Sequence, residues 1–142
     1  MTQTQGLLQF LGGVVLIATG SVLGGAARYF ISGVVARRIG ETFPWGTMTV
    51  NVSGSFVIGV LAALATHRFT VFSSAPFWLF AVTGFLGCYT TVSSFSLQTL
   101  MLASHGETRA ALQNITLALG LCLAAVAGGF SLADFLATSF GG

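Results

Sequence analysis

Four long apolar runs constrain the fold of this chain more than any other feature. They cover about residues 9–35, 47–66, 77–104 and 110–135 of the 142. Each can form a helix that crosses a membrane, because a hydrocarbon core of about 30 Å requires roughly 20 helical residues. The connections between the runs leave no room for a soluble domain. The sequence therefore predicts an all-α membrane protein with a single four-helix transmembrane domain, residues 1–142.

The sparse charge of the chain supports this assignment and excludes several classes of function. Charged residues make up 6% of the chain and hydrophobic residues 54%, which is not the composition of an ordinary soluble domain. A net charge of +2 is too small for a nucleic-acid-binding surface. We find no His-Glu cluster, no nucleophile with a base and no cofactor motif, so we do not expect an enzyme. Cys88 and Cys122 lack metal-ligand spacing and are interpreted as packing residues.

The third apolar run is interrupted by small and polar residues. Residues 84–100 read GFLGCYTTVSSFSLQTL and contain two glycines, three threonines and three serines. Irregular backbone at membrane depth survives only where it is buried in protein or lines a water-filled cavity. A break in the helix around residues 87–91 would expose carbonyls that can coordinate a cation and amides that can bind an anion. We therefore expect the third helix to be broken and the break to form a functional site.

Arg28 lies within the first apolar run, directly after a GGAA segment. An arginine inside a span costs about 2.5 to 3.5 kcal/mol on insertion scales, and such residues usually face a bundle interior or an aqueous cavity. The alternative is that the side chain snorkels to the headgroups. Asp134 is expected at the opposite face of the membrane, so Arg28 would have no buried acid as a partner and would suit an anion. Gly20 and Gly24, just before it, are spaced to let another helix approach closely.

A polar stripe follows one face of the second span, because Thr47, Asn51, Ser55 and Gly59 recur every four residues. Thr47 and Ser55 are explained by hydrogen bonds between helices, which are common in membrane bundles. The amide of Asn51 must be satisfied in lipid, either along a polar path or by a strong interhelical bond. The same two alternatives hold for Asn114 in the fourth span.

The loops carry little information about orientation. Arg37, Arg38 and Arg109 fall on one side of the membrane and Arg68 on the other, which is a weak bias that would allow insertion both ways. His67 has no partner pattern and is interpreted as a plain loop residue. Because four spans barely enclose a pore, we expect an oligomer.

Three segments together resemble a known family. GGAAR in the first span, GTMTVNVSGSFVIG in the second and TGFLGCYTTVSSFS in the third are similar to the small fluoride channels of the Fluc family, in the same order and with the same spacing. This resemblance implies a fluoride-selective ion channel in the plasma membrane or bacterial inner membrane that passively exports fluoride from the cytoplasm. It also implies an antiparallel, dual-topology homodimer with two pores and a structural sodium ion at the dimer centre.

The resemblance also assigns roles to individual residues. The implied fluoride pathway comprises a vestibule arginine, a pore-facing asparagine, the break and restart of the third helix, a phenylalanine ring edge and a polar position of the fourth span: Arg28, Asn51, Thr91, Ser93, Phe95 and Asn114. Backbone carbonyls of Gly87 and Thr90 are implied to hold the sodium ion. Two positions depart from the family pattern. Val92 stands where a second pore phenylalanine is common, and Ala118 stands where a serine is common.

The main alternative function is a small four-helix proton-coupled multidrug exporter. Such a protein needs a buried carboxylate, and the first three predicted spans contain neither Asp nor Glu. A non-transporting structural subunit, in which Asn51 and the glycines serve packing alone, is a further alternative.

Overall fold

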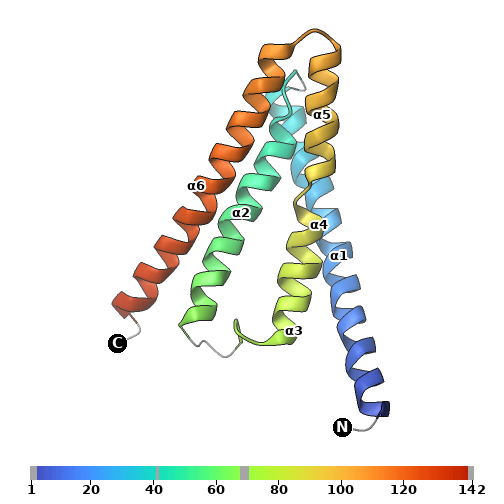
Figure 1. Cartoon of the computed structure of the whole chain (residues 1–142), viewed down its shortest axis with the longest axis vertical. Helices are drawn as coiled ribbons and strands as arrows, with labels where there is room; N and C mark the ends of the chain where they lie inside the picture. Colours follow the sequence, from blue (N-terminus) through green and yellow to red (C-terminus); the bar gives the residue numbers. More distant parts are fainter. Residues whose placement is uncertain (1–2, 41, 68–70, 141–142) are drawn as a thin grey trace.

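All regular secondary structure in the described residues of the computed structural model, which are 3–40, 42–67 and 71–140, is helical (Figure 1). The elements, in order, are α1 (Gln3–Ile39), α2 (Trp45–Thr66), α3 (Ala75–Phe77), the π-helix η1 (Trp78–Leu86), α4 (Gly87–Tyr89), α5 (Val92–Ser104) and α6 (Thr108–Phe140). Four helical stretches are long and apolar enough to cross a membrane: Gln3–Ile39, Trp45–Thr66, Ala75–Ser104 and Thr108–Ser139. The predicted all-α protein with four membrane-spanning helices is therefore confirmed.

The helices extend beyond the apolar runs from which they were predicted. α1 begins at Gln3 rather than near residue 9, and α6 continues to Phe140. Apolar residues mark the part of a helix suited to hydrocarbon, whereas its ends depend on local stop signals. Gly40 follows α1 with a φ of 103° and Gly106 follows α5 with a φ of 82°, a conformation that glycine adopts without steric cost.

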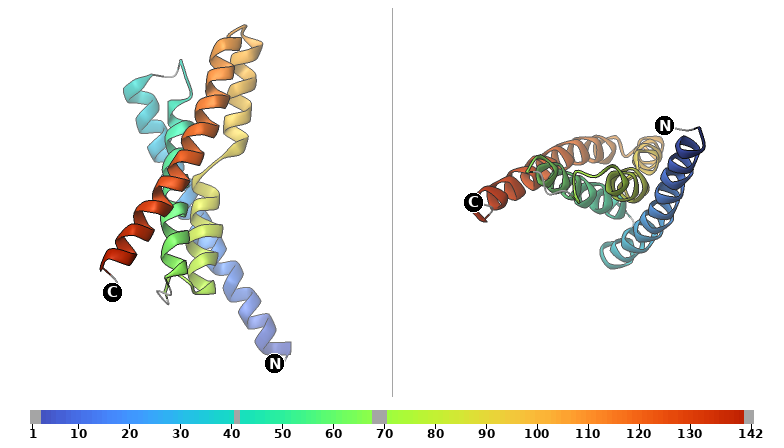
Figure 2. Two further views of the ribbon diagram at one scale, coloured as in Figure 1. Left: turned by 60° about the vertical axis from the view of Figure 1, so that its left-hand side comes forward. Right: turned by 90° about the horizontal axis from the view of Figure 1, so that it is seen from below.

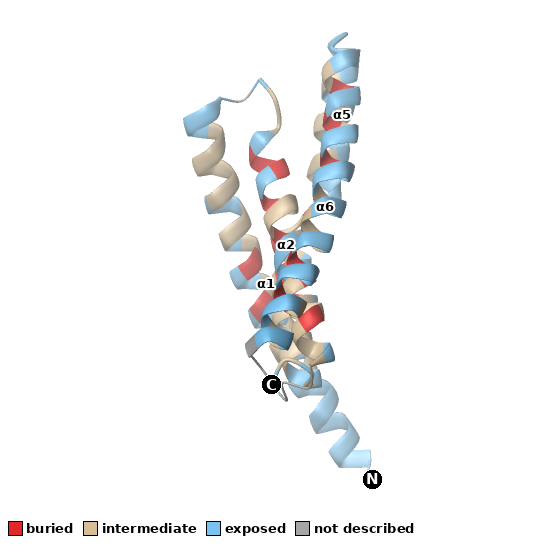
Figure 3. Cartoon of the chain, turned by 90° about the vertical axis from the view of Figure 1, so that its left-hand side faces the viewer, coloured by how far each residue is buried: buried red, intermediate tan, exposed pale blue. Residues whose placement is uncertain are grey.

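The four spans run alternately up and down, so the two ends of the chain lie at the same end of the molecule (Figure 1). α1 packs along η1, α4 and α2, and α6 packs along α2 and α5. Figure 2 shows α1 and α6 at opposite edges, with α2 and the third span between them. Buried residues lie on the faces where the helices meet, and exposed residues cover most of the outside (Figure 3).

Glycines bring two pairs of helices into backbone contact. Gly20 and Gly24 of α1 are buried, and a Cβ added at either would collide with backbone of the third span, at Phe80 and Phe85 respectively. The predicted close approach at this pair is therefore confirmed. The α2–α6 contact has the same character, since a Cβ at Gly59 or Gly129 would strike a backbone carbonyl of the opposite helix.

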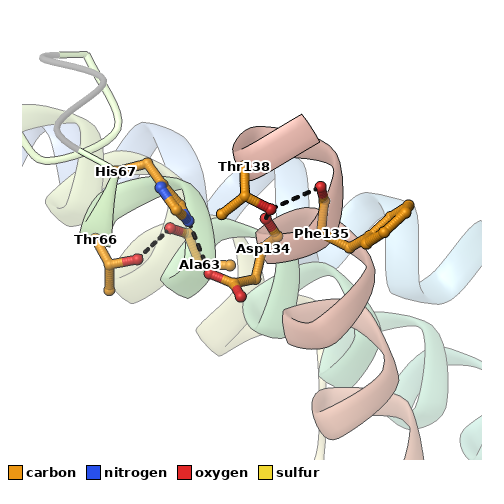
Figure 4. Close-up of polar contacts among 6 residues, drawn as sticks. All are labelled: Ala63, Thr66, His67, Asp134, Phe135 and Thr138. Atoms are coloured by element: carbon orange, nitrogen blue, oxygen red, sulfur yellow. Dashed lines mark hydrogen bonds and ion pairs between the residues drawn. The ribbon is translucent and has the colours of Figure 1, made fainter. Parts of the chain in front are cut away.

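One hydrogen bond, which is also an ion pair when His67 is protonated, joins the ends of α2 and α6 (Figure 4). The Nε2 atom of His67 lies 2.7 Å from Oδ1 of Asp134. His67 lies in the turn after α2, as the interpretation as a loop residue expected, but the expectation that it has no partner was wrong. The two residues are 67 positions apart in the sequence, and only the packing of α2 against α6 brings them together.

Candidate ion pathway

Helical hydrogen bonding in the third span is interrupted at two threonines. α4 ends at Tyr89, and α5 begins at Val92. Between them Thr90 has φ −83° and ψ 161°, and Thr91 has φ −153° and ψ 120°, so both residues are extended. This interruption is narrower than the window of residues 87–91 considered from the sequence, because the backbone of Gly87 and Cys88 is still helical.

The side chain of Asn51 satisfies both backbone groups of Thr91. Its Nδ2 donates to the Thr91 carbonyl over 2.9 Å, and its Oδ1 accepts from the Thr91 N–H over 2.7 Å. One amide thus replaces the partners that a continuous helix or a neighbouring strand would supply. Of the two alternatives for Asn51, the strong interhelical bond is present. Because a primary amide has two N–H donors, one donor of Nδ2 remains for a ligand.

The interruption removes the ordinary helical partners of two carbonyl groups. In a continuous helix the Thr91 N–H would donate to the carbonyl of Gly87, and the Ser94 N–H would donate to that of Thr90. Instead the Thr91 N–H donates to Asn51, and the Ser94 N–H donates to the Thr91 hydroxyl over 3.2 Å. Gly87 is also exposed, and a Cβ added there would meet only the Val82 carbonyl, at 3.7 Å. Carbonyl oxygens are the ligands that hard cations prefer, so this donor set fits a sodium ion.

A cavity of about 440 Å³ adjoins the interruption, between α2, the third span and α6. Asn51, Thr91 and Phe95 line it, together with Gly87 and Thr90. The two positions that depart from the family pattern, Val92 and Ala118, line it as well. The structure therefore brings together three of the six expected fluoride-pathway residues and both expected sodium ligands.

Arg28 lines a second cavity, of about 240 Å³, between α1, α2 and α5. Thr47, Thr91 and Ser94 contribute to the same cavity, so Thr91 lies in the wall between the two. Within residues 3–40, 42–67 and 71–140, Arg28 makes no ion pair with an acid. The side chain is half-buried and faces a polar hollow, which suits an anion entering from that side.

The other two expected pathway residues do not line either cavity. The exposed Ser93 has its hydroxyl 3.1 Å from that of Thr91. Asn114 is only 2% exposed, and its Nδ2 donates to the Thr99 hydroxyl of α5 over 2.8 Å. Asn114 therefore makes an interhelical bond and does not join the stripe on α2.

Sequence reasoning missed two polar residues near the interruption. Ser94 lines the Arg28 cavity, and Thr99 accepts the bond from Asn114. The available signal for Thr99 was its spacing from Phe95, since residues four apart lie on one face of a helix.

Comparisons with known proteins show the family of this chain. The family model described as CrcB-like protein, Camphor Resistance (CrcB), matches residues 15–130. A relative from Bradyrhizobium diazoefficiens, named fluoride-specific ion channel FluC 2, is 69% identical over 126 residues, which cover 89% of this chain and 92% of the relative. A relative of the same name from Rhodopseudomonas palustris is 62% identical over 129 residues, covering 91% and 98%. A fluoride-specific ion channel FluC from Rhodospirillum rubrum is 45% identical over 112 residues, covering 79% and 87%.

These relatives are named as ion channels, and the family is not enzymatic, so the prediction that the chain is not an enzyme is confirmed. Four apolar helices and these relatives also establish a multi-pass membrane protein. The chain therefore belongs to the CrcB family, together with these proteins named fluoride-specific ion channels.

Proposed function

We propose that this protein is a fluoride-selective channel through which fluoride leaves the cytoplasm passively. Family membership and the names of its relatives support fluoride as the ion. The observation that carries the proposal is the bond pair between Asn51 and the backbone of Thr91. It holds extended backbone at the centre of an apolar span, beside a cavity that also contains Phe95.

The proposed pathway replaces the water around fluoride with hydrogen-bond donors of the protein. Fluoride is small and strongly hydrated, so the guanidinium of Arg28, the free amide hydrogen of Asn51 and the hydroxyls of Thr91 and Ser93 would take the place of water. The ring edge of Phe95 is electropositive and can face an anion without trapping it. The resemblance also implies Asn114, but its amide donates to Thr99 and lines neither cavity, so it is not counted among these donors. Conduction requires binding strong enough for entry and weak enough for exit, which a set with one full charge satisfies.

We further propose that two chains form an antiparallel, dual-topology homodimer in which the third helix works as a broken helix and two pores form. The exposed positions next to the interruption support a partner on this face, since Val92 is 76% exposed and Gly87 is also exposed. The weak arginine bias, with three loop arginines at one membrane face and one at the other, supports insertion in both orientations.

A structural sodium ion at the dimer centre is the remaining part of the proposal. The carbonyls of Gly87 and Thr90 would hold it, because both lack their ordinary helical partners. When bound, the ion would add a central positive charge to the field around the pathway. Gly87→Leu tests this assignment, since the chain itself has room for a side chain at that position. We expect a folded protein whose fluoride flux depends less on sodium, and an unchanged sodium response would remove Gly87 from the site.

The main experiment measures fluoride and chloride efflux from liposomes that contain the purified protein, with ion-selective electrodes. We expect rapid fluoride efflux with little chloride efflux. Asn51→Leu should lower fluoride efflux at least about tenfold, because both Thr91 backbone groups lose a partner and the pathway loses a donor. Thr49→Ala is the matched control, since Thr49 is exposed on the same helix. Folded protein without fluoride efflux would refute the proposal.

No observation favours the proton-coupled exporter. Asp134, the acid within the described helices, has a side chain that is 48% exposed and pairs with His67 near the end of α6. It is not the buried carboxylate that such an exporter needs.

A further inference from the structure

We propose that Asn114 is a positioning residue that fixes the rotation of α5, and through it the ring of Phe95, rather than a direct ligand of fluoride. This inference rests on the proposed function. It states that the Asn114 side chain acts on α5 rather than on the ion. The observations that carry it are the hydrogen bonds at the two ends of one face of α5.

The amide of Asn114 bonds to α5 and lines neither of the two cavities. Its side chain is only 2% exposed and lines neither the cavity with Phe95 nor the cavity with Arg28. Its Nδ2 donates to the Thr99 hydroxyl over 2.8 Å, and that hydroxyl donates in turn to the carbonyl of Phe95 over 2.7 Å. A chain of two hydrogen bonds thus links α6 to the backbone of Phe95.

The position of Phe95 between two anchors explains why this link matters. Thr91, Phe95 and Thr99 follow one another at intervals of four residues: Thr91 is the N-cap of α5, and Phe95 and Thr99 lie one turn apart on one face of the helix. The first of them is held by Asn51 from α2, and the last is held by Asn114 from α6. Phe95 lies one turn from each anchor, so a rotation of α5 about its axis would move the ring out of the cavity.

Packing within the chain gives α5 little other restraint. No residue of Val92–Ser104 is fully buried, and its N-terminal end is separated from α4 by extended backbone. Among the described residues, Phe95 is the one aromatic that lines the larger cavity, and Val92 lines it beside Phe95. The angle of this single ring therefore depends on two asparagines, of which Asn51 borders the cavity and Asn114 does not.

The flux experiment compares Asn114→Ala, Thr99→Val and the double variant, each checked for folded protein by size-exclusion chromatography. We expect each single variant to lower fluoride flux by about tenfold, and the double variant to lower it by about the same factor rather than about a hundredfold, because both remove the same link. Thr99→Ser should retain the parental flux because it keeps the hydroxyl.

Gln113→Ala is the control for this experiment, since Gln113 is exposed beside Asn114. If Thr99→Val does not fold, Thr99→Ala replaces it. The inference would be overturned if the variant without the Thr99 hydroxyl conducted fluoride like the parent while Asn114→Ala had low flux. That result would favour direct contact between Asn114 and fluoride.

A second measurement does not depend on conduction. With 4-fluorophenylalanine incorporated at position 95, we expect one sharp ¹⁹F resonance in the otherwise unchanged protein. Asn114→Ala and Thr99→Val should broaden or split it, and Gln113→Ala should not. An unchanged resonance in both variants would refute the positioning role. A changed resonance in a protein that conducts no fluoride would refute the proposed function while leaving the positioning role intact.

Discussion

The helix crossings and the interruption of the third span are held together by opposite means. At the crossings, Gly24 meets the backbone at Phe85 and Gly59 meets it at Val126, so the helices touch where side chains are missing. At the interruption, the side chain of Asn51 satisfies the extended backbone of Thr91. Close packing of small residues builds the scaffold, whereas specific donors build the site. Changes at the crossings should therefore abolish assembly, and changes at the interruption should alter conduction in a folded protein.

The largest expected effect comes from Gly24→Leu. A side chain at position 24 would collide with the backbone at Phe85, which cannot move aside as a flexible side chain would. Overpacking of this kind costs about 3 kcal/mol or more, so little monodisperse protein should be recovered by size-exclusion chromatography. Gly12→Leu on the same helix is the control, because nothing lies within 4 Å of a Cβ there. Equal yields from the two variants would show that the α1 crossing is not a close backbone contact.

Arg28→Ala tests the site rather than the helix crossings. Arg28 makes no ion pair within the described part of the chain, so its removal should leave the yield and the melting temperature nearly unchanged. Fluoride flux in liposomes should fall by about tenfold, because the cavity loses its one full positive charge. Arg38→Ala, at the exposed end of α1, should conduct like the parent. Parental flux in Arg28→Ala would reject the proposed role of this arginine.

Val92→Phe asks whether the departure from the family pattern matters. The Val92 side chain is 76% exposed within the chain, so a larger side chain has room and should change stability by less than about 0.5 kcal/mol. We expect a folded protein with a fluoride flux within about threefold of the parent, measured by the same electrode assay. Failure of the variant to assemble would show that position 92 packs against a partner subunit and that the valine is required there.

The contrast between the two regions also explains what the sequence could predict. The four spans follow from apolar runs of sufficient length, and the close approach of α1 follows from the spacing of Gly20 and Gly24. The glycines and hydroxyls of the third span also indicated where extended backbone would occur. These features depend on residues close together in the sequence.

The features that were not predicted depend on the register between distant helices. No local pattern shows that Asn51 meets Thr91, 40 residues later, or that Asn114 meets Thr99 rather than α2. The π-helix Trp78–Leu86 could not be predicted from local sequence either, since it lies where the third span packs closely against α1. The pathway assignment of Ser93 came from the resemblance alone, and that of Asn114 from the resemblance and its polar character; neither residue lines either of the two cavities.

The smallest expected effect comes from Asp134→Asn, which breaks the ion pair with His67 far from both regions. The two side chains are 27% and 48% exposed, and ion pairs this open to solvent contribute about 0 to 1 kcal/mol. The melting temperature should therefore fall by no more than a few degrees. Glu107→Gln is the control, since it removes one negative charge from an exposed residue that forms no ion pair within the described residues. Fluoride flux should be unchanged in both variants. A flux that falls tenfold in Asp134→Asn alone would mean that the ends of α2 and α6 set the geometry of the interruption, and the separation between scaffold and site would then be wrong.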